Sequence, residues 1–386
     1  MRTVNLQKSQ KPPTIGVDAS RSSVLQRTGT ENYSLQMIKA LITTKTNYLW
    51  RLYYRDSPVS SLFSTSSLVE HKVMQSPITW THLRLSAELA FNPPDLLFVP
   101  AHVLPIYCPV PSIVTVHDLG FMHYPSMHPP LQLAYLRWST NHNVLHANHV
   151  IADSEATKTD IINNYQIEPT KITVVYPGFN PQLYANPDQK NIYPNLPDSY
   201  ILHVGTLHPR KGLVVLLKAI ARLRERNINL NLVCAGRDGW MTSSIRKQVE
   251  SLDIENMVHF VGFVPQEHLP TLYSRAKLTV LPSLYEGFGY TTLESMAAAT
   301  PVVCTTAGSL PEVVGDAALT VPADDSVALA EAVNTVLTNQ ALRKQLIIEG
   351  LKRCKMFSWS STAKQTLAII EQILSAKDSH VSNTHL

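Results

Sequence analysis

Short apolar runs rich in β-branched residues alternate with longer segments of helical period along this chain, and the alternation comes in two blocks. In the first block we predict strands at Thr14–Asp18, Leu49–Tyr54, Leu96–Pro100, Ile113–Asp118, Val150–Ser154 and Ile172–Tyr176. In the second block we predict strands at Tyr200–Gly205, Asn229–Gly236, Val258–Val264, Leu278–Pro282, Val302–Thr305 and Leu319–Val321. Strands that are apolar on both faces and separated by helices are typical of parallel sheets covered on both sides.

The stretch Pro177–Pro197 separates the two blocks. It is rich in Pro and Asn, follows neither period, and is interpreted as an interdomain linker. A chain of 386 residues also exceeds the size of one ordinary core. We therefore predict an α/β protein with two Rossmann-like, doubly wound parallel sheets facing a cleft, where ligands bind at the carboxyl ends of the strands. The polar first ten residues and residues 377–386 are expected to be loose or frayed.

The charge balance is weak but uneven. The 33 Lys and Arg residues against 29 Asp and Glu residues give a net charge of +4, too little to indicate nucleic acid. Residues 1–50 hold seven basic and two acidic residues. That part could meet an anionic membrane surface or an anionic acceptor, or form an ordinary solvated face.

The four cysteines are far apart, and no apolar leader or membrane-length apolar stretch is present. The cysteines are thus expected to be free buried thiols, and the protein cytoplasmic, with at most peripheral contact at the inner face of the cytoplasmic membrane.

The segment Pro282–Pro301 gives the strongest functional signal. It is interpreted as a strand, a glycine loop with Gly287 and Gly289, and a helix that starts near Thr291. The free N–H groups at such a helix start bind phosphate. Glu286 and Glu294 flank this anion site, where they would accept hydrogen bonds from hydroxyl groups of a sugar and a ribose. Alternatively, Glu294 is only a favourable helix charge and Glu286 a solvated loop residue.

A second element runs from Gly205 to Gly212 and carries Arg210 and Lys211 just before a predicted helix. These two cations would neutralise a diphosphate as it leaves. The element is not a P-loop, because Gly rather than Ser or Thr follows the lysine. Solvated charges at a helix start are the alternative.

The N-terminal block offers two weaker candidates. His117 follows an apolar strand, so it is expected in the cleft, where it could bind a sugar hydroxyl or move a proton. Gly29 and Thr30 open a predicted helix and form a second glycine loop, for an acceptor or the donor phosphate, or a plain helix start. No cluster with metal-ligand spacing occurs, so we predict no metal and no other cofactor.

These motifs resemble those of the GT-B fold retaining glycosyltransferases of family 4, the group 1 glycosyltransferases. The resemblance rests on Glu286 and Glu294 with seven residues between them, the loop Glu286–Gly289, and Arg210–Gly212. It covers nearly the whole chain and extends to further segments: Val99–Pro105, Thr115–Leu119, Ala152–Ser154, Val175–Gly178 and Ala307–Glu312. Phe357–Trp359 resembles the point where such chains cross back to the first domain.

The resemblance implies an acceptor-side domain over residues 1–180, a donor-binding domain over 181–357, and a helix at about 360–376 that packs back on the first domain. It implies that Arg210 and Lys211 contact the diphosphate, with Gly205 beside them. Glu294 would hold the ribose and Glu286 the donor sugar. His117 would lie near the transferred sugar. The donor would also meet Gly287 and the backbone of Phe288, Gly289, Tyr290 and Thr291.

The same resemblance implies a metal-independent transfer that retains the anomeric configuration. Val99–Pro105 and Thr115–Leu119 most resemble the bacterial mannosyltransferases of surface polysaccharide synthesis. This favours GDP-mannose as donor, with UDP-sugars as an alternative, and a glycan or lipid-linked glycan as acceptor.

Three other functions are weighed against this one. A sugar-nucleotide epimerase or hydrolase of the same fold would turn over the donor without an acceptor. An NAD-dependent oxidoreductase is disfavoured, because Gly287-Phe288-Gly289 lacks the third glycine of the dinucleotide motif. A non-catalytic relative need not keep Arg210, Lys211, Glu286 and Glu294 together.

Overall fold

The computed structural model of the chain describes residues 11–383, except 25–26, 28, 59–61, 64–65, 77–78, 102, 186, 188–192, 194 and 240, with side chains described up to Lys377. The first ten residues, His102 of the segment Val99–Pro105 and part of the predicted linker therefore lie outside the described residues. Within them, no helix is both long and apolar enough to cross a membrane.

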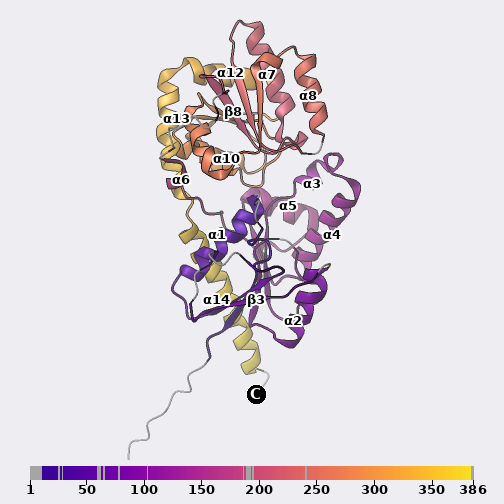
Figure 1. Ribbon diagram of the computed structural model, residues 1–386. Helices are drawn as coiled ribbons and strands as arrows, with labels where there is room; N and C mark the ends of the chain where they lie inside the picture. The colour runs from indigo at the N-terminus through magenta and orange to yellow at the C-terminus, as the bar shows by residue number, and fades with distance from the viewer. Residues whose placement is uncertain are drawn as a thin grey trace, which may run out of the picture.

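Two all-parallel sheets form the centres of two domains, which confirms the predicted fold class (Figure 1). The first sheet has the order β3-β2-β1-β4-β5-β6-β7 and the second the order β10-β9-β8-β11-β12-β13. In each sheet the chain starts in the middle and winds outward in both directions, as in doubly wound folds. The strands are β1 (Thr14–Asp18), β2 (Leu49–Tyr54), β3 (Val69–Val73), β4 (Leu96–Val99), β5 (Ser112–Val116), β6 (His149–Ala152), β7 (Ile172–Val174), β8 (Tyr200–Val204), β9 (Asn231–Ala235), β10 (Val258–Gly262), β11 (Thr279–Leu281), β12 (Val302–Thr305) and β13 (Leu319–Val321).

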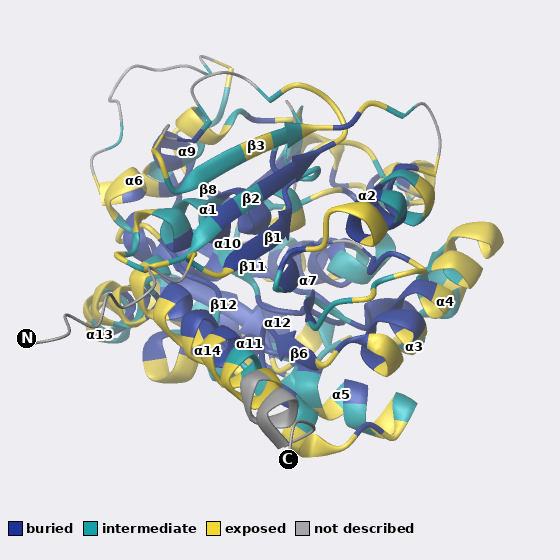
Figure 2. Cartoon of the chain, turned by 90° about the horizontal axis from the view of Figure 1, so that it is seen from below, coloured by how far each residue is buried: buried dark blue, intermediate teal, exposed yellow. Residues whose placement is uncertain are grey.

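Helices cover both faces of each sheet, and their apolar sides form the cores (Figure 2). The helices are α1 (Gly29–Thr43), α2 (Ser86–Phe91), α3 (Gly120–His123), α4 (Pro130–His146), α5 (Glu155–Tyr165), α6 (Gln182–Ala185), α7 (Leu213–Glu225), α8 (Thr242–Ser251), α9 (Leu269–Arg275), α10 (Tyr290–Ala297), α11 (Leu310–Val314), α12 (Ser326–Thr338), α13 (Gln340–Arg353) and α14 (Trp359–Asn383). Shorter turns are the π-helical η1 (Trp80–Leu85) and the 3₁₀ turns η2 (Pro125–Met127), η3 (Pro169–Lys171), η4 (Pro209–Lys211), η5 (Glu255–Met257), η6 (Gln266–His268), η7 (Gly315–Ala317) and η8 (Cys354–Met356).

Each predicted strand overlaps a strand of the structure, but one strand, β3, was missed. The edge strand β3 has the sequence Val-Glu-His-Lys-Val and is largely accessible to solvent, so it lacks the apolar run on which the prediction rested. Several predictions also extend too far. Strand β5 ends at Val116, so His117 and Asp118 stand in the loop after it, at the carboxyl edge of the sheet.

The predicted linker is partly structured. It contains α6, and its residues Phe179 and Tyr184 are buried in the core of the second domain. The sequence showed no sign of this helix, because a helix of four residues is too short to show a period.

After Phe357 the chain returns to the first domain as α14, which runs along the lower domain in Figure 1. Its residues Ala363, Leu367 and Ile370 join the core that includes Ile15 of β1. The backbone of α14 is helical as far as Asn383, and residues 384–386 lie beyond the described part, so a frayed tail over residues 377–386 stays an expectation.

Candidate active site

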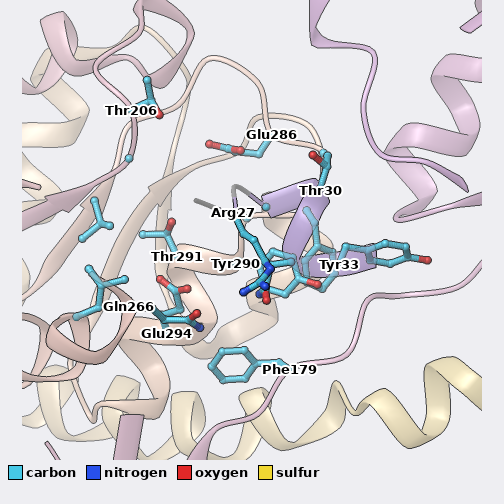
Figure 3. Close-up of a pocket in the computed structure, with 18 of the residues that line it drawn as sticks. Arg27, Thr30, Tyr33, Phe179, Thr206, Gln266, Glu286, Tyr290, Thr291 and Glu294 are labelled. Atoms are coloured by element: carbon cyan, nitrogen blue, oxygen red, sulfur yellow. The ribbon is translucent and has the colours of Figure 1, made fainter. Parts of the chain in front are cut away.

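A cavity of about 700 Å³ lies between the two domains, at the carboxyl edges of both sheets. Loops after β1, β5 and β6 line one wall, and loops after β8, β9 and β11 line the other (Figure 3). The sequence-predicted residues all lie on these walls: Gly29, Thr30, His117, Gly205, Arg210, Lys211, Glu286, Gly287, Phe288, Gly289, Tyr290, Thr291 and Glu294.

Glu286 is paired and buried. Its Oε1 accepts hydrogen bonds from Nζ of Lys211 and from the hydroxyl of Ser283, both at 2.6 Å. Burial alone would raise the pKa of Glu286, but Lys211 and Arg210 beside it lower the pKa below its usual value. With only 7% of the residue exposed, Glu286 is not the solvated loop residue of the alternative interpretation.

Arg210 lies beside Lys211 in η4 and also contacts both domains. Its Nη1 donates to the backbone oxygen of Tyr285 at 2.9 Å, next to Glu286. On the other side lies Asp118 of the first domain. Burial would raise the pKa of Asp118, but the positive charge of Arg210 and the N–H of Gly120 help to lower it below its usual value. The structure thus gathers two cations and two carboxylates at one end of the cavity.

Glu294 has a different environment at the other end. The hydroxyl of Tyr273 donates to its Oε2 at 2.7 Å, and Tyr184 of α6 lies next to it. Burial raises the pKa of Glu294, and the tyrosine hydroxyls only partly oppose this. Figure 3 shows Glu286 and Glu294 apart from each other, with Thr291 between them.

The glycine loop between the two glutamates brings backbone close to the cavity. Gly289 has φ +90°, a left-handed conformation that other residues rarely adopt, and α10 begins directly after it at Tyr290. The N–H of Thr292 donates to the backbone oxygen of Gly289 at 3.0 Å, so it is not free for a ligand. Phe288 turns its side chain into the core against Tyr176 and Phe357, so only its backbone can meet a ligand.

Gly287 marks where the two domains touch. A Cβ atom at this position would lie 2.3 Å from the backbone oxygen of His117 and 2.6 Å from Cβ of Asp118. No side chain fits there while the domains keep this arrangement.

His117 lines the cavity, and both of its ring nitrogens have partners. Nδ1 lies 2.7 Å from Oδ2 of Asp153, and Nε2 lies 3.1 Å from the backbone oxygen of Pro100. Burial lowers the pKa of His117, but Asp153, Asp118 and the backbone oxygen of Pro100 together outweigh it, so the net shift is upward. The ring edge also packs on Tyr33, with 4.8 Å between the ring centroids. Nε2 of His117 can therefore meet a ligand only after it leaves the backbone oxygen of Pro100.

Gly29 and Thr30 open α1 and reach the cavity, as Figure 3 shows for Thr30. A Cβ atom at Gly29 would meet nothing within 4 Å, so a larger residue would also fit at this position.

Sequence reasoning missed several residues of this site. Arg27, just before the Gly29–Thr30 loop, lines the cavity, and its Nε donates to the backbone oxygen of Ser22 at 3.2 Å. A cation directly before a glycine loop was the available signal. Asp153 lay in the resembling segment Ala152–Ser154 but was given no role, and Tyr184 and Tyr273 gave no signal, because they come from distant parts of the chain.

Comparison with known proteins agrees with this geometry. Residues 68–183 match the family model described as "Glycosyltransferase Family 4", and residues 186–353 match "Glycosyl transferases group 1". The O-antigen chain mannosyltransferase B of Escherichia coli is 31% identical over 263 residues, which cover 66% of this chain and 69% of that protein. The O-antigen chain mannosyltransferase RfbU of Salmonella typhimurium is 28% identical over 80% of this chain and 87% of its own length.

Solved structures share the architecture. A sucrose-phosphate synthase from Thermosynechococcus elongatus superposes with a TM-score of 0.75 at 22% identity, covering 94% of this chain and 100% of that one. Anabaena HepE, solved in complex with UDP and glucose, gives 0.71 at 18% identity, covering 93% and 99%. Two facing doubly wound sheets with a cleft at their carboxyl edges define the GT-B class of transferases. Within it, the chain belongs to family 4, the group 1 glycosyltransferases, and is a glycosyltransferase.

Proposed function

We propose that this enzyme transfers a hexose, with mannose favoured, from a nucleoside diphosphate sugar to a glycan or lipid-linked glycan acceptor. The observation that carries the proposal is the cluster of Arg210, Lys211 and Glu286 at one end of a cavity whose other end holds Glu294.

A donor would lie along the second domain. Arg210, Lys211 and the N–H groups at the start of α10 would hold the diphosphate, since a helix start and two cations both favour a negative charge. Glu294 would accept from the ribose hydroxyls and Glu286 from the hydroxyls of the sugar. The cavity volume of about 700 Å³ falls in the range of sites that enclose small molecules. HepE, a structural neighbour, was solved with UDP and glucose, which supports a nucleotide-sugar donor here.

The reaction in this proposal retains the anomeric configuration. The bond between the anomeric carbon and the phosphate oxygen breaks, and the acceptor oxygen forms its bond on the same face. The acceptor proton passes to the leaving phosphate oxygen. Arg210, Lys211 and the α10 helix start would stabilise the charge that develops on the diphosphate without a metal ion.

The mannose donor and the acceptor class rest on the relatives. Both curated mannosyltransferases named above act in O-antigen chains, so GDP-mannose and a growing surface polysaccharide are the substrates we propose. UDP-sugars are the alternative donors. We also propose a cytoplasmic location with peripheral contact at the inner membrane face through the basic first fifty residues.

Thermal unfolding with a panel of GDP, UDP, ADP and dTDP tests the donor. A ligand that binds only the folded protein raises its stability, so GDP should raise the Tm most. A largest shift with another diphosphate would replace GDP-mannose by a donor of that base. Incubation with the matching sugar nucleotide, with and without oligosaccharide acceptors, then tests the reaction. Equal turnover of the donor in both cases would favour a hydrolase or epimerase.

A further inference from the structure

A carboxylate of the second domain binds the start of a helix in the first domain. Glu312 of α11 accepts at Oε2 from the backbone N–H of Glu155 (2.9 Å) and at Oε1 from that of Ala156 (3.0 Å). These residues are the first two of α5, a helix of eleven residues. A carboxylate at this position satisfies two N–H groups that lack partners inside the helix and also interacts favourably with the helix dipole.

The helix start that Glu312 binds also carries the partner of His117. Asp153 lies two residues before α5 and holds Nδ1 of His117. Ser154 between them caps the helix, because its hydroxyl accepts from the N–H of Thr157 at 3.1 Å. The hydroxyl of Thr157 in turn donates to the backbone oxygen of His117 at 3.3 Å. A shift of the α5 start therefore moves the groups that fix His117.

The segment Gly308–Glu312, here called the coupling turn, also holds the backbone of Glu286. Ser309 donates to the backbone oxygen of Glu286 through its N–H at 3.0 Å and its hydroxyl at 3.1 Å. Gly308 passes so close that a Cβ atom there would lie 2.3 Å from the same oxygen. One end of the coupling turn thus fixes Glu286, and the other end binds the start of α5.

Glu312 is held in place from both sides of the domain boundary. The hydroxyl of Tyr176 donates to its Oε2 at 2.9 Å. The guanidinium of Arg353 donates to the backbone oxygens of Glu312 and Val313. Further along α5, Asp160 accepts from the hydroxyl of Tyr285, the neighbour of Glu286. Helix α5 therefore contacts the second domain at two points, Glu312 and Tyr285.

We infer that Glu312 is a positioning residue: its contact with the start of α5 holds Asp153 and His117 of the first domain at a fixed place relative to Glu286 of the second when the cleft is closed. This inference rests on the proposed function for the roles of His117 and Glu286. Glu312 itself does not line the cavity among the described residues, so it acts through α5 rather than on a substrate.

Glu312→Gln is the informative change, because glutamine has one carbonyl oxygen and an amino group, which would face one of the α5 N–H groups with another donor. We expect kcat to fall by about 10- to 100-fold, because misplaced reacting groups lower the rate by this order of magnitude. The Kd of the nucleoside diphosphate should change by less than about twofold. Tyr124→Phe is the matched control. It removes another hydrogen bond between the domains, from the Tyr124 hydroxyl to the backbone oxygen of Leu284 at 3.1 Å, without touching α5. It should change kcat by no more than about threefold.

Two further measurements show whether Glu312 acts through His117. In the double variant Glu312→Gln with His117→Ala, kcat should be no lower than in His117→Ala alone, because the two changes remove the same effect. Full additivity would overturn the inference. The ring ¹⁵N NMR signals of His117, assigned with His117→Ala, should shift in Glu312→Gln and stay in place in Tyr124→Phe.

The NMR measurement needs no transfer activity, so it tests the coupling between Glu312 and His117 separately from the proposed function. Unchanged His117 signals in Glu312→Gln, or a kcat equal to that of the wild type, would overturn the coupling. Shifted His117 signals would support it even if no hexose transfer were found, and the absence of transfer by the wild type would overturn only the proposed function.

Discussion

The cavity wall formed by the second domain, here called the donor wall, carries a glutamate at each end, and the two glutamates have opposite surroundings. At one end Glu286 accepts from Lys211 and Ser283, and these cationic surroundings lower its pKa. At the other end Glu294 accepts from Tyr273 and lies beside Tyr184, and burial raises its pKa. Only eight positions along one loop and helix separate them.

The comparison shows that a glutamate's chemistry depends on which neighbours the fold brings to it. Glu286 is a fixed negative charge beside Lys211 and Arg210, and under the proposed function it would hold these cations in position for a diphosphate. Among the described residues, the side chains that donate to Glu294 are the neutral hydroxyls of Tyr273 and Tyr184, which suits a group that would bind further neutral hydroxyls.

The largest effect is expected at the cationic end. Glu286→Gln should lower kcat by about 10²- to 10³-fold, because it removes the charge that organises Arg210 and Lys211 for the leaving diphosphate. It should also destabilise the fold by about 2 kcal/mol, since Lys211 loses its carboxylate partner; this is less than for fully buried pairs, because the Lys211 side chain is 22% exposed. Initial rates and urea unfolding measure the two effects.

The matched control is Glu286→Asp, which keeps the charge and should recover part of the stability. Wild-type transfer by Glu286→Gln would show that this end of the cavity does not take part in the reaction.

At the end of the cavity that holds Glu294, a substitution should weaken binding more than it lowers kcat. Glu294→Gln should weaken nucleoside diphosphate binding by about tenfold, as expected for a lost hydrogen bond to a charged group, with little change in kcat. Without ligand this variant should be more stable than the wild type, because a buried carboxylate with a raised pKa is costly to ionise. Calorimetric titration and thermal unfolding check both, and a less stable variant would contradict the assigned environment.

The pH dependence should separate the two glutamates. As the pH falls, Glu294 takes up its proton first, because its pKa is raised, and Glu286 only at lower pH, because its pKa is lowered. Protonated Glu294 accepts hydrogen bonds less well, so diphosphate affinity should fall, by up to about tenfold, before Glu286 loses its charge. The stability that Glu286 contributes is present above its unfolded pKa and is lost only as the pH falls through its lower folded pKa.

Binding measured along a pH series in wild type and Glu294→Gln tests this order. The first drop should be missing in the variant, and its persistence there would assign it to another group.

The smallest effect is expected from metal removal. If Arg210 and Lys211 neutralise the diphosphate, transfer should proceed unchanged in EDTA. A strict requirement for added Mg²⁺ or Mn²⁺ would mean that the cationic end alone is insufficient. The control is a parallel assay of a known metal-dependent transferase in the same buffer.

The sequence predicted the parts of this molecule that depend on neighbours along the chain. The apolar runs identified the two sheets, and the loop from Glu286 to Thr291 identified the donor wall because glycines, carboxylates and the helix start lie within one short segment. It missed contacts between distant segments. Tyr184 and Tyr273 meet at Glu294, and Asp153 meets His117, only because the chain folds, and no local spacing announces such pairs. The exposed strand β3 was missed because an edge strand does not need an apolar run.

Helix α14 is synthesised last but completes the core of the first domain, so the order of synthesis and the order of folding differ. Ala363, Leu367 and Ile370 fill the core beside β1, and Trp359 packs on Tyr33, which in turn contacts His117. While the ribosome is still making the second domain, the first one lacks these side chains, although domains made first usually fold first. The wall that holds His117 therefore cannot reach its final packing until the second domain and α14 have been synthesised.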